Sequence, residues 1–156
     1  MCHTPDNGYR SPLGYVSERI HAASVYCSDG RVGEHFDDFL QQGLGLPRYD
    51  RVALPGGPGC LAGHTEARLE QEGLIGELKF LADAHKLERI VLIQHEGCAF
   101  YQQRLGVEPE RAESLQKADL VRAAFQIRRV TVGLKIEGYF AKHDGDCLVF
   151  EAVSVE

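Results

Sequence analysis

The sequence of 156 residues lacks several features that mark large classes of protein. Lys and Arg form no run longer than the pair Arg128-Arg129, and the formal net charge is −6. A nucleic-acid partner is therefore not expected. No apolar run approaches the ~20 residues that a membrane-spanning helix needs. Residues 1–8 also lack the apolar segment of a secretory signal peptide, so we expect a cytoplasmic protein with no membrane partner.

Cysteine is present in an odd number, five, at irregular spacings, which does not fit a framework of disulfides. In a chain without a signal segment, this usage favours reduced thiols. Internal repeats, low-complexity tracts and linker-like stretches are also missing. We therefore predict a single domain over residues 1–156, whose first 14 residues form an irregular segment because they are rich in turn-forming residues.

Hydrophobic periodicity predicts alternating strands and helices along the rest of the chain. Strands are predicted at about 21–26, 49–54, 89–94, 130–136 and 147–153, with a hairpin turn at Asp144-Gly145. Helices are predicted at 34–42, from about 65 to 85 with a break near Gly73, at 99–105 and at 109–126. This order predicts an α/β fold with a mostly parallel sheet and an antiparallel edge strand at the C-terminus.

Three local patterns carry narrower expectations. In the last helix, the spacing predicts a buried row formed by Leu115, Ala118, Val121 and Phe125. The loop at 55–59 is rich in Gly and Pro but lacks the Gly-Lys-Ser/Thr ending of a phosphate-binding loop, so nucleotide binding is not expected there. Cys60 and His64 are interpreted as structural residues or as part of a pocket lining, and Cys147 as a core residue of its strand.

Metal-binding residue types occur where two strands are predicted to end. His95 and Cys98 follow the apolar run Ile90–Ile93, and a thiolate there would gain from the dipole of the following helix. A His-x-x-Cys pair needs a partner from elsewhere, and Cys27, at the end of another strand-like run, is the best candidate. The competing interpretation is two buried thiols and a core histidine, because free cysteine is among the most buried residue types.

The combination of Cys27-Ser-Asp29-Gly-Arg31 with His95-Glu-Gly-Cys98 resembles the β-class carbonic anhydrases. The resemblance implies Zn2+ held by Cys27, His95 and Cys98, with Asp29 and Arg31 as catalytic residues beside the metal. It further implies a three-layer fold with strand order 2-1-3-4-5, a homodimer or higher homo-oligomer, and CO2 or bicarbonate as small-molecule substrate. With that order, Cys27 and His95 lie on either side of the point where the strand order reverses, where α/β proteins bind ligands.

The expected function is reversible hydration of CO2 to bicarbonate by a zinc-bound hydroxide. Two thiolates and an imidazole leave one position of a zinc tetrahedron open for water, whose pKa the metal lowers. Asp29, when held by Arg31, can orient that water, and when freed it can occupy the open position itself. Two alternatives stay open: a zinc hydrolase of a CO2 analogue such as carbonyl sulfide or carbon disulfide, and a catalytically inactive zinc-binding relative with Asp29 as the fourth ligand.

Overall fold

A five-stranded sheet forms the centre of the molecule in the computed structural model, which describes residues 6–156. Its strands are β1 (Ala22–Cys27), β2 (Asp50–Leu54), β3 (Arg89–His95), β4 (Lys135–Asp144) and β5 (Cys147–Val153). They lie in the order β2-β1-β3-β4-β5; the first four are parallel, and β5 is antiparallel to β4. The predicted strand order and the antiparallel edge strand are confirmed.

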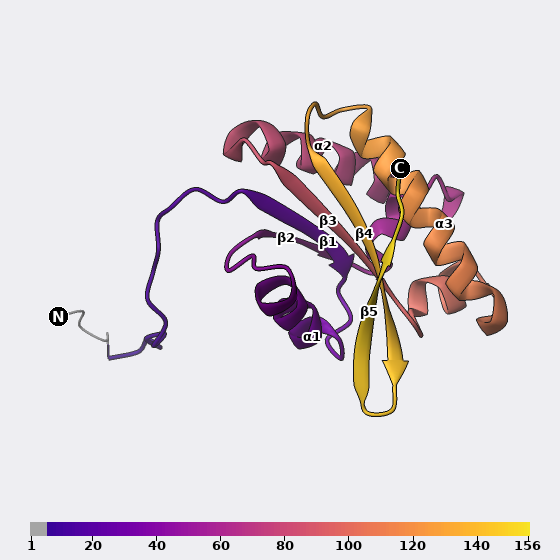
Figure 1. Cartoon of the computed structure of the whole chain (residues 1–156), viewed down its shortest axis with the longest axis horizontal. Helices are drawn as coiled ribbons and strands as arrows, with labels where there is room; N and C mark the ends of the chain where they lie inside the picture. The colour runs from indigo at the N-terminus through magenta and orange to yellow at the C-terminus, as the bar shows by residue number, and fades with distance from the viewer. Residues whose placement is uncertain (1–5) are drawn as a thin grey trace.

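Helices cover both faces of the sheet and give three layers (Figure 1). On one face lies α1 (Gly33–Asp38), which continues into a π-helical turn at Phe39–Gly43. The other face carries α2 (Arg68–His85) and α3 (Pro109–Arg128). Shorter helical turns occur at Gly57–Leu61, Thr65–Ala67 and Phe100–Arg104.

The two central strands are buried on both faces, as a continuous apolar run predicts for a parallel sheet. Successive side chains of β3 point to opposite faces. Ile90 and Leu92 therefore pack in the core beneath α2 and α3, whereas Val91 and Ile93 pack in the core beneath α1. Because the sheet is sealed on both sides, only the ends of these strands can present side chains to a ligand.

The helix is confirmed as α3, and Leu115 of its predicted buried row packs partly buried against the core, but the prediction is wrong for Val121 and Phe125. Val121 and Phe125 are 39% and 60% exposed, respectively. The buried face instead carries Ala112, Gln116, Asp119, Leu120, Ala123, Ala124 and Ile127. Several of the side chains that contact the sheet are small or polar. A prediction based on the spacing of large apolar residues therefore places the buried side of the helix on the neighbouring face.

Two further boundaries differ from the prediction. The strand expected at 130–136 begins only at Lys135, because Gly133 adopts a left-handed φ of 73° that a strand cannot contain, and Val132 is 99% exposed. No break interrupts α2 at Gly73, where a glycine costs about 1 kcal/mol relative to alanine. Burial of Leu74 and Leu78 on the inner face of α2 offsets that cost.

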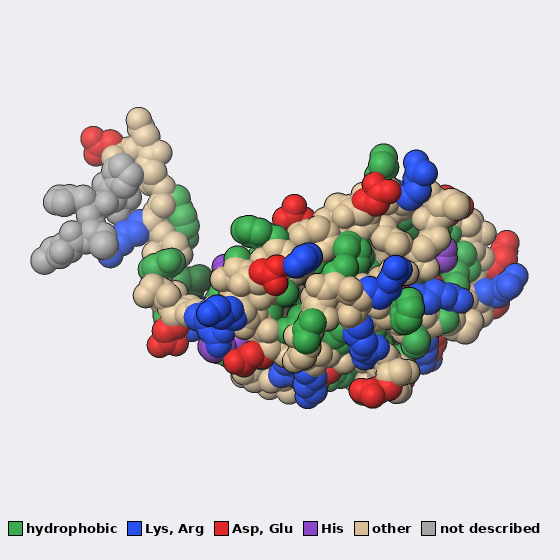
Figure 2. All heavy atoms as spheres, turned by 90° about the horizontal axis from the view of Figure 1, so that it is seen from above, with side chains coloured by type: hydrophobic (Ala, Val, Ile, Leu, Met, Phe, Trp, Pro, Cys, Tyr) green, Lys and Arg blue, Asp and Glu red, His purple; other side chains and the backbone are tan. Residues whose placement is uncertain are grey.

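Residues 6–14 contain turns but neither helix nor strand, which agrees with the predicted irregular segment; residues 1–5 of that segment lie outside the described residues. The first described residues stand away from the body (Figures 1 and 2), with Tyr9, Leu13 and Tyr15 exposed, whereas Val16, Glu18 and Arg19 are hydrogen-bonded to it. Between residues 6 and 156, every cysteine is a free thiol. Across the same range, no helix combines the length and apolar content that crossing a membrane requires.

Candidate metal centre

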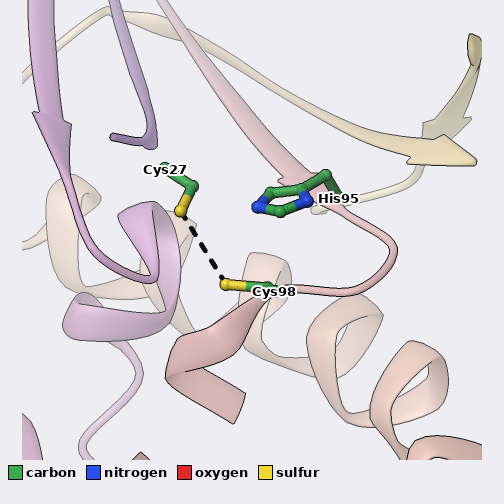
Figure 3. Close-up of side chains that lie close together, drawn as sticks. All are labelled: Cys27, His95 and Cys98. Atoms are coloured by element: carbon green, nitrogen blue, oxygen red, sulfur yellow. Dashed lines mark hydrogen bonds between the residues drawn. The ribbon is translucent and has the colours of Figure 1, made fainter. Parts of the chain in front are cut away.

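The three residues singled out as metal ligands lie together at the ends of two neighbouring strands. Cys27 ends β1, His95 ends β3, and Cys98 follows one turn later. Their ligand atoms all lie within 4.8 Å of one another, and all three residues are buried. Figure 3 shows the two sulfur atoms and the imidazole ring facing the same point. Among the described residues, this is the only group of at least three such side chains that could hold a metal ion.

The imidazole of His95 has one nitrogen occupied and one free. Its Nδ1 lies 2.9 Å from the carbonyl oxygen of Glu96. A carbonyl oxygen only accepts, so Nδ1 carries the proton and Nε2 carries the lone pair. Nε2 is buried and has no hydrogen-bond partner among residues 6–156. Leaving a buried polar atom without a hydrogen bond costs about 1–3 kcal/mol. A metal-binding histidine has the same arrangement as His95, because one of its ring nitrogens donates to a carbonyl oxygen while the other is left for the metal.

The two sulfur atoms have the spacing of a pair of zinc ligands and share one hydrogen bond. Cys98 Sγ lies 3.9 Å from Cys27 Sγ; two sulfurs each about 2.3 Å from a tetrahedral zinc would lie about 3.8 Å apart. The hydrogen bond from Cys98 lowers the pKa of Cys27 and, in the same contact, raises that of Cys98. Burial adds to the rise in the pKa of Cys98, and hydrogen bonds from the backbone N–H groups of Phe100 and Tyr101 only partly oppose it. This donor set fits zinc.

The loop after β2 contributes backbone contacts to the centre, at a segment that the resemblance places near the active site but whose contacts its own residue pattern does not predict. Leu54 pairs with Cys27 in the sheet, so the glycines that follow lie against the end of β1. A backbone hydrogen bond from Gly56 lowers the pKa of Cys27. Gly57 has φ of 48°, and a Cβ there would lie 2.6 Å from the carbonyl carbon of Tyr26. The sequence feature that could have indicated this contact is the pair Gly56-Gly57, which comes just after β2, the parallel neighbour of β1.

Asp29 and Arg31 form the pair expected beside the metal ligands. Arg31 Nη2 donates to Asp29 Oδ2 at 2.7 Å, and its Nε lies 3.1 Å from both carboxylate oxygens. The backbone N–H of Arg31 also donates to Oδ1 at 2.9 Å. The side-chain hydrogen bond with Arg31 lowers the pKa of Asp29 to about 2, so the carboxylate is ionised near neutral pH. Asp29 is 17% exposed and Arg31 77% exposed, which places the pair at the edge of the buried centre.

A cavity of about 330 Å3 reaches this edge. Its lining includes Arg31, His35, His95, Glu96 and His143, from β1–α1, the end of β3 and the β4–β5 hairpin. Glu96 accepts a hydrogen bond of 2.8 Å from the backbone N–H of His143, which ties the hairpin to the turn between His95 and Cys98. Small molecules therefore have an approach to His95 along a wall that carries basic side chains together with Glu96 and Asp146.

The Cys60 and His64 pair has no shared site. Cys60 donates to the carbonyl oxygen of Pro55 at 3.2 Å, whereas His64 Nε2 lies 2.6 Å from Asp119. This arrangement agrees with the structural interpretation of both residues. The expectation for Cys147 is wrong, because this thiol is exposed at the start of β5, beside the hairpin turn.

The fold and the site together define an α/β protein of the β-carbonic anhydrase type, with a Cys-His-Cys group at the point where strand order reverses. A family model described as "Putative carbonic anhydrase" matches residues 17–153. The chain therefore belongs to this carbonic anhydrase family, as a divergent β-class member.

Solved structures show the same fold. The β-carbonic anhydrase isoform I of the protozoan Trichomonas vaginalis is 15% identical, with a TM-score of 0.59 over 88% of this chain and 86% of that one. The β-carbonic anhydrase of the fungal pathogen Aspergillus fumigatus is 14% identical, with a TM-score of 0.52 over 88% and 77%. A search of curated protein sequences finds no match.

The different environments of Cys60 and Cys147 predict different thiol reactivity. Burial raises the pKa of Cys60 to about 12, so roughly one thiol in ten thousand is ionised at about pH 8. We expect iodoacetamide to modify Cys147 in the folded protein and Cys60 only after denaturation, as measured by peptide mass mapping. Modification of Cys60 in the folded protein at the same rate as Cys147 would contradict this assignment. A Cys147→Ser variant is the control, because it removes the thiol that is expected to react.

Proposed function

We propose that this chain is a zinc enzyme that reversibly hydrates CO2 to bicarbonate. The observation that carries the proposal is the buried group of Cys27, His95 and Cys98 with an Arg31-held Asp29 at its edge. Membership of a carbonic anhydrase family and the fold shared with two proteins named β-carbonic anhydrases support it. The metal, the catalytic roles and the substrate are all parts of this proposal.

The two thiolates and His95 Nε2 would hold zinc, and the Nδ1–H bond to the Glu96 carbonyl would keep the ring in the required tautomer. The chemistry that zinc supplies when bound is the acidification of a water molecule, which makes hydroxide available near neutral pH. Buried surroundings strengthen the electrostatic interactions on which that effect depends.

Asp29 would act as the hydrogen-bond acceptor that orients the attacking water. Three hydrogen-bond donors of Arg31 converge on its two oxygens, so the carboxylate is held in one position and stays ionised. The same contacts restrain it from becoming a metal ligand, because leaving Arg31 would break a bidentate, charge-assisted pair. Arg31 would thus be a positioning residue, and Asp29 the residue that contacts the water.

Membership of a carbonic anhydrase family favours CO2 hydration over the alternative of a carbonyl sulfide or carbon disulfide hydrolase. The cavity lining carries both signs of charge, with Arg31 on one side and Glu96 and Asp146 on the other, so it does not separate the two substrates. The third possibility, an inactive zinc-binding relative, requires Asp29 to leave Arg31.

Metal analysis and stopped-flow CO2 hydration test the proposal, on protein purified with a reductant. We expect one zinc per chain and hydration activity in the parent, and loss of both in Cys98→Ala because one of three protein ligands is removed. Cys60→Ala is the matched control, since it removes another buried thiol that lies outside the ligand group.

Zinc retained in Cys98→Ala would reject the ligand assignment. A zinc-loaded parent that hydrolyses carbonyl sulfide but does not hydrate CO2 would favour the hydrolase. A zinc-loaded parent that turns over neither substrate would favour the inactive relative.

Arg31→Ala tests the role of the Asp-Arg pair. The freed Asp29 carboxylate is expected to become a metal ligand in place of water, so zinc content should stay near one per chain while hydration falls at least tenfold. Asp29→Asn should retain more activity, because an amide coordinates zinc poorly and leaves the site open. Arg51→Ala, which breaks the ion pair with Asp37, is the control. Undiminished hydration in Arg31→Ala would show that the pair is only a turn contact.

We also propose that the chain associates with copies of itself, at least as a dimer. The exposed Tyr9, Leu13 and Tyr15 in the segment before β1, and Phe125 on the outer face of α3, leave apolar surface that a second copy would cover. Light scattering at micromolar concentration should give a mass of at least two chains. A single-chain mass under those conditions would reject the proposal.

A further inference from the structure

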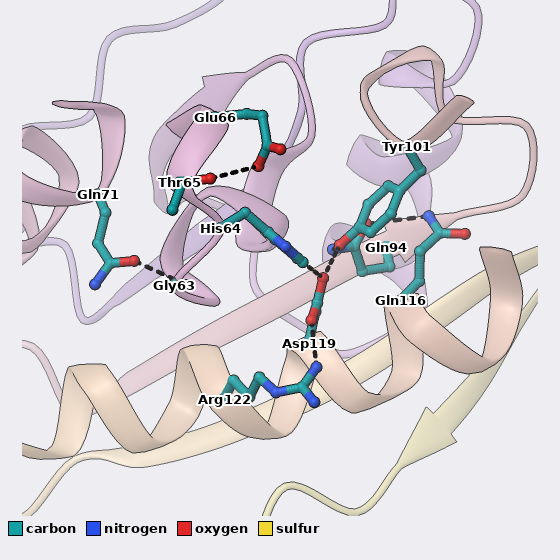
Figure 4. Close-up of polar contacts among 10 residues, drawn as sticks. All are labelled: Gly63, His64, Thr65, Glu66, Gln71, Gln94, Tyr101, Gln116, Asp119 and Arg122. Atoms are coloured by element: carbon teal, nitrogen blue, oxygen red, sulfur yellow. Dashed lines mark hydrogen bonds and ion pairs between the residues drawn. The ribbon is translucent and has the colours of Figure 1, made fainter. Parts of the chain in front are cut away.

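A chain of buried polar side chains runs from α3 to the end of β3, and Figure 4 shows its members Asp119, Tyr101, Gln94 and Gln116. Tyr101 and Asp119 are both fully buried, and Tyr101 donates from its hydroxyl to Asp119 at 2.7 Å. Gln94 donates to the Tyr101 hydroxyl at 2.8 Å, and Gln116 donates to the Gln94 amide oxygen at 3.2 Å. The network reaches the surface only at His64 and Arg122, which lie 2.6 and 2.8 Å from the Asp119 carboxylate.

The direction of each hydrogen bond in this chain follows from the contact between Tyr101 and Asp119. The Tyr101 hydroxyl donates to the carboxylate of Asp119 and therefore accepts from Gln94. Burial, followed by the charge of Asp119, raises the pKa of Tyr101, which keeps that hydroxyl protonated. The amide nitrogen of Gln94 then faces Tyr101 and its oxygen faces Gln116. Gln116 consequently presents its NH2 group to Gln94.

The far end of the network holds the turn that carries two of the metal ligands. Gln116 Nε2 also donates to the carbonyl oxygen of His95 at 2.8 Å. Tyr101, anchored through its hydroxyl, directs its backbone N–H to the sulfur of Cys98. Both sides of the turn between His95 and Cys98 are therefore attached to α3, one through Gln116 and the other through Asp119.

We propose that Asp119 is a positioning residue for the metal centre, acting through Tyr101 on Cys98 and through Gln94 and Gln116 on His95. The inference rests on the proposed zinc site and adds to it a support on a different helix. A packing role alone would not need a buried carboxyl group at this position, because apolar side chains of similar volume fill a core without the cost of burying polar atoms. The hydrogen bonds, moreover, lead from Asp119 to the ligand turn.

Tyr101→Phe is the main test, because it removes one hydroxyl and keeps the ring. Removing a support of this kind typically weakens metal binding by about 10–100-fold. We expect a zinc affinity lower by at least about tenfold, measured by chelator competition. The absorption bands of the cobalt-substituted protein should also shift, because the position of Cys98 or His95 around the metal changes.

Tyr49→Phe is the matched control. Tyr49 is also buried and donates its hydroxyl to a carboxylate, that of Asp37, but it packs in the core beneath α1. Its loss should lower the free energy of unfolding while leaving zinc affinity and the cobalt spectrum at parent values. Asp119→Asn is the second variant: it preserves shape and one acceptor oxygen, so it should fold and should shift the cobalt spectrum in the same direction as Tyr101→Phe.

Parent-like zinc affinity and cobalt spectra in both Tyr101→Phe and Asp119→Asn would overturn the positioning role, whatever their stability. A parent protein that binds neither zinc nor cobalt would overturn the metal centre, and this inference with it. The titration of the parent therefore distinguishes failure of the proposed function from failure of the network.

Discussion

The parallel pairing of β1 with β2 on one side and β3 on the other is the constraint on which the site depends. It aligns Val25 with Leu92 and Cys27 with Leu54. Because side chains alternate between faces along a strand, a shift of one residue would turn Cys27 away from His95. The same register brings the glycine loop after Leu54 against the end of β1. One set of strand pairings thus positions the Cys27 thiol, the His95 imidazole and a loop that donates to the Cys27 sulfur.

The centre combines a rigid side with a more exposed side. Cys27, His95 and Cys98 are buried and receive hydrogen bonds from the backbone or from α3, so their positions depend on the packed core. Asp29 and Arg31 lie at the edge, where Arg31 is mostly exposed. The ligand geometry is therefore fixed by folding, whereas the group that would orient water is held by one pair that solvent can reach. A buried ligand group with an exposed edge would suit a site that keeps a metal bound while small molecules enter and leave.

Local patterns were sufficient to predict the α/β class, the strands apart from the start of β4, and the positions of Cys27, His95 and Cys98 at or just after strand ends, where the folded chain brings them together. Asp29 and Arg31 were singled out by the resemblance to a family. Each of these residues lies within a short motif that follows a predicted strand, so chain neighbours alone place them near a strand end. The strand order came from the resemblance to a family. Contacts between distant segments could not be predicted in this way, because Gly57 lies against Tyr26 only in the folded chain. The start of β4 was also not predictable, because the left-handed backbone of Gly133 interrupts the alternating apolar pattern that begins at Val130.

The least predictable element, the inner face of α3, is also the one that reaches the metal centre. Gln116 and Asp119 occupy positions where hydrophobic periodicity expects apolar residues, and Val121 and Phe125 are exposed instead. Burying these polar groups is costly unless each finds a partner, and they find theirs in Tyr101, Gln94 and the His95 carbonyl. Sequences tend to break local rules where function requires it. The departure of α3 from the apolar pattern is therefore a structural argument that this helix supports the site as well as the core.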